Sequence, residues 1–135
     1  VGCGPGMQTV ELLRNCAGTV VAIDCLPEML DRATAHAASA GFSDRLETAM
    51  QDMAEMTFST SSFDVIWCEG AIYNLGFEAG LREFRSFVKP GGYVAVSEAV
   101  WLKPDPPPEA VEFWREYPEI DSVGQKLEVI RGRQL

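Results

Sequence analysis

Short apolar runs alternate with helical patterns along residues 1–99. The apolar runs are rich in β-branched and aromatic residues, which is typical of strands buried in a sheet. They lie at residues 19–24, 63–68 and 93–97, and a weaker strand pattern lies at residues 46–50. Helical spacing or composition is found between them, at residues 27–40 and 77–88. This alternation predicts an α/β fold built on a parallel sheet with helices on both faces.

Both predicted helices carry stop signals. Pro27 suits the first turn of the first helix, and Gly41 stands where that helix should end. The second helix should end before Pro90 and the two glycines after it, because proline cannot continue a helix and glycine permits a turn.

The last third of the chain has a different pattern. Residues 103–108 are rich in proline, which predicts a stiff, extended linker. A helix is expected over residues 109–117. Ser122 and Gln125 have the spacing of a capping box, which predicts another helix running to about Arg131.

Length and composition favour one soluble domain. The 135 residues are 47% hydrophobic, which suffices for a core. With 11 Lys+Arg against 20 Asp+Glu, the net charge is −9, which disfavours nucleic acid and anionic membranes as partners. No apolar run approaches the roughly 20 residues of a membrane span. We expect a single domain over residues 1–135, with a core at 1–99 and a linker and flanking helices at 100–135.

The two ends and the cysteines add to this picture. The chain opens inside a glycine-rich motif and stops just after a helical pattern, which predicts a fold truncated at both ends. The cysteines form no C-x-x-C pair and His36 is the single histidine, so we expect no metal site. Reduced thiols in the cytoplasm are the expected context. His36 itself is expected to face solvent from the helix at 27–40.

The glycine-rich start of the chain is the most informative motif. Gly2, Gly4 and Gly6 form a G-x-G-x-G run between a strand and a helix, where the backbone can approach a ligand closely. The dinucleotide fingerprint G-x-G-x-x-G would need a glycine at position 7, which is Met7. This departure disfavours a nicotinamide or flavin cofactor.

Two acids follow the strands next to this turn. Asp24 closes the run 19–24, and an acid there can accept hydrogen bonds from both hydroxyls of a ribose. The alternative is a cap for the helix that begins at Pro27. Asp52 follows the run 46–50 and can accept from the amine of an adenine, or it can be an ordinary loop residue.

Five segments with these features occur in order: VGCGPG, VVAIDCLPEML, QDMAEM, FDVIWCEG and FVKPGGYVAVSE. Over residues 1–99 they resemble the class I S-adenosylmethionine-dependent methyltransferases, in the branch that mostly methylates small molecules. The resemblance implies a Rossmann-like, doubly wound and mostly parallel sheet. It also implies S-adenosyl-L-methionine as a phosphate-free cofactor and a small molecule as the methyl acceptor.

Carried over position by position, the resemblance implies a set of cofactor contacts. They run from Gly2, Cys3 and Gly4 to the methionine and ribose, from Asp24 to the ribose hydroxyls, from Cys25 and Leu26 to the adenosine, from Asp52 and Met53 to the adenine edge, and from Glu69 to the sulfonium end.

The segment after the strand at 63–68 should face the methyl acceptor, because ligands collect beyond the carboxyl ends of parallel strands. Glu69 can orient the methionine amino group or act as a general base. Tyr73 and Asn74 can hydrogen-bond the acceptor, or they can serve helix capping and loop packing. Two other functions stay open: a cofactor-binding protein without catalysis, and an NAD(P)-dependent oxidoreductase.

Overall fold

The computed structural model describes residues 1–132. The chain divides into two compact units, Val1–Phe58 and Ser59–Leu135, which we call the N-terminal and the C-terminal unit. Each unit contains a parallel pair of strands joined through a helix, as the alternating pattern predicts. No helix within residues 1–132 is long and apolar enough to cross a bilayer.

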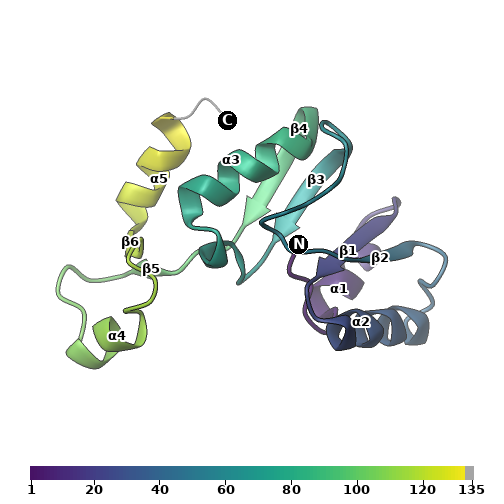
Figure 1. Cartoon of the computed structure of the whole chain (residues 1–135), viewed down its shortest axis with the longest axis horizontal. Coiled ribbons are helices and arrows are strands. Elements are labelled where there is room, and N and C mark those ends of the chain that lie inside the picture. Colours follow the sequence, from purple (N-terminus) through teal and green to yellow (C-terminus); the bar gives the residue numbers. More distant parts are fainter. Residues whose placement is uncertain (133–135) are drawn as a thin grey trace. The chain divides into compact units, whose positions relative to one another are not determined.

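The N-terminal unit is a β-α-β arrangement preceded by one helix (Figure 1). Its elements are α1 Met7–Asn15, β1 Val20–Asp24, α2 Pro27–Ser39 and β2 Leu46–Met50. The two strands pair in parallel from Val20 opposite Leu46 to Asp24 opposite Met50. Both strands therefore end at the same edge of this small sheet.

Close approach of α1 and α2 depends on Gly6, which immediately precedes α1. Its φ of 85° is left-handed, and an added Cβ would lie 2.6 Å from Ala33 Cα in α2. Any larger residue would collide with the backbone of α2. Behind this contact, Val10 and Leu13 of α1 bury their side chains with Ala37 of α2.

The C-terminal unit repeats the strand-helix-strand order and adds a flank. Its elements are β3 Phe63–Cys68, the 3-10 helix η1 Ile72–Asn74, α3 Phe77–Phe87, β4 Val88–Val96, β5 Val100–Trp101, α4 Pro108–Phe113, β6 Asp121–Ser122 and α5 Val123–Gly132 (Figure 1). β3 pairs in parallel with β4, and β5 with β6. α3 buries Leu81 and Phe84, and Gly80 on the same face leaves room for the Ile72 side chain.

The strand predicted at residues 93–97 begins earlier than expected. β4 starts at Val88, directly after α3, because Val88 is buried and pairs with Phe63. The register then shifts, so that Tyr93 lies opposite Val65. The glycine-rich segment between these pairs therefore forms an irregularity within the strand.

The flank also differs in part from its prediction. The helix expected over residues 109–117 is the shorter α4, and the proline-rich linker bends over residues 102–105. α5 runs one residue past Arg131, close to its predicted end. Half of the predicted capping box forms, with Gln125 N–H donating to Ser122 Oγ at 3.3 Å. The other half does not, because Ser122 N–H donates to Asp121 instead.

Candidate functional site

The glycine-rich turn lies at the carboxyl end of β1. Cys3 N–H donates to the Ile23 carbonyl at 3.0 Å, which holds the turn beside the strand. Gly2 and Gly4 have positive φ values of 61° and 50°, a conformation that favours glycine. Apart from its chain neighbours, no atom of residues 1–132 lies within 4 Å of the position that a Cβ on Gly4 would take. The turn thus exposes its backbone to open space.

Asp24 links this turn to the start of α2. Its Oδ2 accepts from Gly4 N–H at 2.8 Å, and its Oδ1 accepts from Leu26 N–H at 3.1 Å. The second bond closes a local turn before α2 and does not cap the helix, because no side chain among the described residues caps α2. Because each carboxylate oxygen can accept more than one hydrogen bond, both remain available to ligand hydroxyls.

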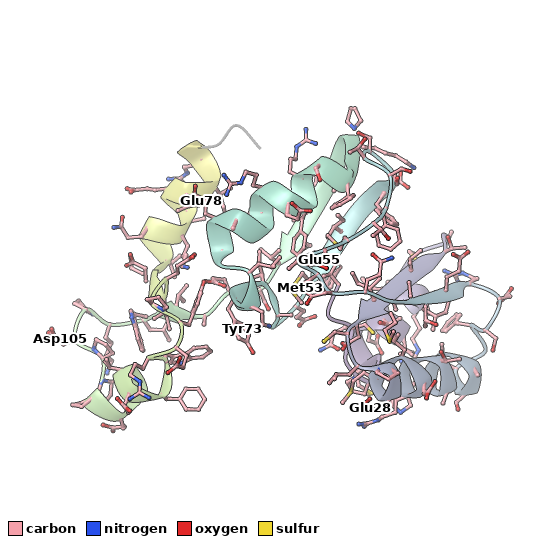
Figure 2. All side chains as sticks on the ribbon, in the orientation of Figure 1. Glu28, Met53, Glu55, Tyr73, Glu78 and Asp105 are labelled. Carbon is pink, nitrogen blue, oxygen red and sulfur yellow. The ribbon has the colours of Figure 1, made fainter. Side chains whose placement is uncertain are left out.

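Asp52 and Met53 follow β2 at the same edge. The Gln51 N–H donates to the Asp24 carbonyl at 3.2 Å, so the chain after β2 starts beside the end of β1. Asp52 is exposed, and its Oδ1 accepts from Ala54 N–H at 2.8 Å in a tight turn. Figure 2 labels Met53 in this loop. Cys25 and Leu26, after β1, are exposed as well.

His36 does not face solvent as expected. It is half-buried, and its Nδ1 lies 2.7 Å from the Pro5 carbonyl, to which the ring N–H donates. The histidine therefore helps to hold the glycine-rich turn against α2. The error arose because an alanine-rich helix gives little pattern from which to choose its buried face.

The chemistry of this edge fits a ligand with hydroxyl and amine groups and no phosphate. Two carboxylates lie at this edge, Asp24 against the turn and Asp52 after β2, and residues 1–13 contain no Lys or Arg. Burial raises the pKa of the Cys3 thiol, and the negative charge of Asp24 raises it further. The thiol is therefore neutral at pH 7 and adds no anionic charge. These properties suit S-adenosylmethionine, whose sulfonium is cationic.

Glu69, in the C-terminal unit, follows β3 directly. It is exposed, and its Oε2 accepts from Trp67 Nε1–H at 3.2 Å. The next residue, Gly70, donates its N–H to Ser97 Oγ at 2.7 Å, and Ser97 N–H donates to the Cys68 carbonyl at 3.1 Å. These bonds join the ends of β3 and β4 through the two residues on either side of Glu69.

Tyr73 and Asn74 lie on η1, close behind Glu69 in the chain. The Asn74 side-chain amide donates to the Ala71 carbonyl at 2.9 Å, which is the loop-packing role considered above. Tyr73, labelled in Figure 2, is 39% exposed. Its ring meets the rings of Trp114 and Tyr117, with centroids 6.1 and 5.9 Å away.

Sequence reasoning missed a buried polar cluster in the same unit. Lys126 Nζ lies 2.7 Å from Glu98 Oε1 and donates to Tyr117 Oη at 3.1 Å, while the Tyr117 hydroxyl donates to Glu98. One signal was available: Glu98 lies shortly after the end of β4, as Glu69 lies after the end of β3. A hollow of about 430 Å³ beside Lys126 and Glu119 contains none of the predicted site residues in its lining.

The predicted site residues thus form two groups. Gly2, Cys3, Gly4, Asp24, Cys25, Leu26, Asp52 and Met53 gather at the carboxyl edge of the β1–β2 sheet in the N-terminal unit. Glu69, Tyr73 and Asn74 follow the carboxyl end of β3 in the C-terminal unit.

Comparison with known proteins identifies the family. The family described as "Methyltransferase domain" matches residues 1–92. The chain is 31% identical over 106 residues to sterol 24-C-methyltransferase ERG6B of Gibberella zeae, covering 78% of this chain and 27% of that protein. It is 30% identical over 101 residues to methyltransferase GfsG of Streptomyces halstedii, covering 74% and 36%. The chain therefore spans about a third or less of these relatives.

Solved structures show the same fold. A methyltransferase from Geobacter sulfurreducens in complex with S-adenosyl-L-homocysteine has a TM-score of 0.82 at 19% identity, covering 98% of this chain and 53% of that one. Geranyl diphosphate C-methyltransferase from Streptomyces coelicolor has a TM-score of 0.76 at 19% identity, covering 99% and 51%. The cyclase SpnF has a TM-score of 0.78 at 24% identity, covering 97% and 48%. The chain belongs to the class I S-adenosylmethionine-dependent methyltransferase family.

Proposed function

We propose that the protein containing this chain binds S-adenosyl-L-methionine and transfers its methyl group to a small-molecule acceptor by in-line displacement. The observation that carries the proposal is the Asp24 carboxylate, held 2.8 Å from Gly4 N–H beside an open glycine turn. A carboxylate at the end of the strand beside such a turn is suited to ribose hydroxyls. We further propose that both units belong to one methyltransferase domain over residues 1–135, with its core at 1–99.

The cofactor would lie along the carboxyl edge of β1 and β2. Asp24 would accept from the ribose hydroxyls, and Asp52 from the adenine amine. The open space over Gly4 supports a close approach of the methionine and ribose to the turn. The remaining contacts proposed are those of Gly2 and Cys3 with the methionine and ribose, of Cys25 and Leu26 with the adenosine, and of Met53 with the adenine edge.

The chain's own contribution to the chemistry would be to align the reactants and exclude water. When bound, the cofactor supplies a methyl group that its positively charged sulfur already activates. In the proposed in-line displacement, the acceptor atom would bond to the methyl carbon as the carbon–sulfur bond breaks, with the electron pair left on sulfur. Glu69 would orient the methionine amino group near the sulfonium. With an acceptor that carries a proton on the reacting atom, Glu69 is the candidate base.

Tyr73 and Asn74 are the proposed acceptor contacts. Their position on η1, after the carboxyl end of β3, and the 39% exposure of Tyr73 support this role. The net charge of −9 supports a small-molecule acceptor rather than nucleic acid or an anionic membrane. Four free cysteines support a reducing, cytoplasmic location.

Calorimetric titration of S-adenosyl-L-methionine into the protein tests the cofactor assignment. Asp24→Ala should raise the Kd at least about tenfold, which corresponds to about 1.4 kcal/mol. Asp24→Asn should show a similar loss while preserving the shape of the side chain. Asp31→Ala on the exposed side of α2 is the matched control and should bind like the wild type. An unchanged Kd for a folded Asp24→Ala protein would refute the ribose contact.

A cofactor-binding protein without methyl transfer is the second candidate, since SpnF shares the fold and is named a cyclase. The two candidates separate when the protein is supplied with methyl-labelled S-adenosyl-L-methionine. The acceptors to test are a sterol, geranyl diphosphate and a metabolite extract. Label in a product supports the methyltransferase. Intact cofactor binding without label in any product favours the second candidate. Tight nicotinamide binding would instead revive the oxidoreductase, which Met7 disfavours.

A further inference from the structure

Three side chains in the C-terminal unit bury their polar groups in one cluster, Glu98–Tyr117–Lys126. The side chains of Glu98 and Lys126 are 8% and 9% exposed, and Tyr117 is 6% exposed. Glu98 Oε1 forms an ion pair with Lys126 Nζ and accepts a hydrogen bond from the Tyr117 hydroxyl. The Lys126 ammonium also lies over the Phe77 and Tyr117 rings, 4.7 and 5.1 Å from their centroids. The contacts around Tyr117 therefore restrict its ring from several sides.

Stability alone is a weak reason for such a cluster. A buried ion pair loses hydration that its mutual attraction barely offsets, and apolar replacements are often as stable or more stable. The Glu98 Oε2 atom is buried and has no hydrogen-bond partner among residues 1–132, which adds to this cost. What the cluster does provide is a directional hydrogen bond that sets the orientation of the Tyr117 ring.

The Tyr117 ring packs against the rings of Tyr73 and Trp114. Its centroid lies 5.9 Å from that of Tyr73 and 6.4 Å from that of Trp114. Trp114 and Tyr73 meet edge to face at 6.1 Å, so the three rings contact one another mutually. Tyr73 belongs to the segment proposed to face the acceptor, and Trp114 directly follows α4.

The position of Trp114 depends on anchors outside α4, because α4 itself buries no residue. One anchor is the hydrogen bond that the Tyr117 hydroxyl donates to Glu98. The other is Glu119, whose Oε2 accepts from the Phe77 N–H at the start of α3 at 2.8 Å. The connection between α4 and β6 is thus attached at two points, two residues apart, to the part of the unit that carries η1.

We propose that Glu98, Tyr117 and Lys126 are positioning residues for methyl transfer: they orient the Tyr117 ring and, through it, hold Tyr73 and Trp114 as an aromatic wall against the acceptor. This inference rests on the proposed function, because it requires Tyr73 to face the acceptor. The wall suits an acceptor with an apolar or planar part, since flat aromatic faces favour such groups over strongly hydrated ones.

Tyr117→Phe is the sharpest test, because it removes the hydroxyl and keeps the ring. We expect the acceptor KM to rise about tenfold, with the Kd of S-adenosyl-L-methionine unchanged within about twofold, since misplacing a positioning group by an ångström has effects of this size or larger. The acceptor is the compound of highest turnover among the sterol, geranyl diphosphate and extract components tested above. Tyr93→Phe is the matched control, because Tyr93 is 72% exposed.

A double variant tests the ion pair without leaving one charge buried alone. Glu98→Gln with Lys126→Met removes both charges and should raise the acceptor KM in the same direction as Tyr117→Phe. The control is Asp64→Asn with Lys89→Met, which removes an exposed pair of 2.9 Å in the same unit and should leave both constants unchanged. Thermal melting confirms that each variant is folded at the assay temperature.

The outcomes separate this inference from the function on which it rests. If the wild type labels no acceptor, the proposed methyl transfer fails and the positioning role fails with it. If the wild type is active and folded Tyr117→Phe keeps the wild-type acceptor KM, the positioning role alone is wrong. An equal loss of cofactor and acceptor binding would show a merely structural cluster and would also overturn it.

Discussion

Asp24 accepts hydrogen bonds from the Gly4 and Leu26 N–H groups, at 2.8 and 3.1 Å. These two bonds connect Gly4, twenty positions before Asp24, with Leu26, two positions after it. The carboxylate therefore shapes the glycine turn and the entry to α2 before any ligand arrives. At the scale of single residues, this preorganisation is the physical basis for the proposed cofactor site, since the ribose would meet an acceptor group already in place.

Thiol labelling provides a residue-scale test that needs no acceptor. Cys25 is exposed and would lie beside the adenosine, whereas the exposed Cys16 lies beyond the end of α1. At a cofactor concentration ten times its Kd, iodoacetamide should label Cys25 about tenfold more slowly, because about one molecule in ten remains free. Cys16 should react at its original rate. Mass spectrometry of peptides measures both rates, and equal protection of the two thiols would contradict the assignment.

At the scale of elements, α1 and α2 pack through the buried side chains of Val10, Leu13 and Ala37 and, at the start of α1, through a glycine contact. Gly6 meets Ala33 at a distance that excludes a Cβ, and its φ of 85° is unfavourable for other residues. The third glycine of the run thus serves helix packing, while Gly4 leaves the ligand side open. The same motif therefore carries both a structural and a proposed binding role.

Gly6→Ala should lower the free energy of unfolding by about 2–4 kcal/mol, since it combines left-handed strain with a backbone collision. Gly41→Ala is the matched control: Gly41 has a φ of +82° but no atom within 4 Å of an added Cβ. It should lose only about 1–2 kcal/mol from strain. Urea unfolding monitored by circular dichroism compares the two. Equal losses would show that the contact with Ala33 contributes nothing.

At the scale of the whole molecule, burial perturbs titrating groups in both units. Burial raises the pKa of the Cys3 thiol, and burial likewise raises that of Cys68. Burial also raises the pKa of Tyr117, and its hydrogen bond to Glu98 raises it further. In each case the folded chain favours the neutral, protonated form.

The sign of the resulting pH dependence follows from these shifts. Below the ordinary pKa values of 9.0 for a thiol and 10.0 for a tyrosine, both states hold their protons and the stabilisation is complete. Above them, the unfolded chain loses protons first, so the free energy of unfolding should fall as the pH rises from about 8 to about 11. Urea unfolding across this range measures it. Tyr117→Phe should reduce the fall in the free energy of unfolding above pH 10, and Tyr93→Phe should not. A constant free energy would contradict the shifts.

Much of the fold could be predicted because it depends on local patterns. The strands at residues 46–50 and 63–68 have the predicted bounds, since polar residues flank both segments in the sequence. The hydrogen bond between Gly4 N–H and Asp24 was not predicted, but the meeting of the glycine turn and Asp24 at one edge follows from parallel strand order. The start of β4 at Val88 could not be read locally, because it depends on pairing with Phe63 across the sheet.

By itself, the sequence determined the alternation of strands and helices over residues 19–97, the family, and the positions of Asp24 at the end of β1 and of Asp52 just after β2. These features follow from periodicity and from the position of glycines and carboxylates along the chain. Only the tertiary structure decided that His36 bonds to Pro5, that Gly6 packs on Ala33, and that the Glu98–Tyr117–Lys126 cluster exists. The physical reason is the same in each case. Such contacts join residues far apart in sequence, and which atoms meet depends on how whole elements pack.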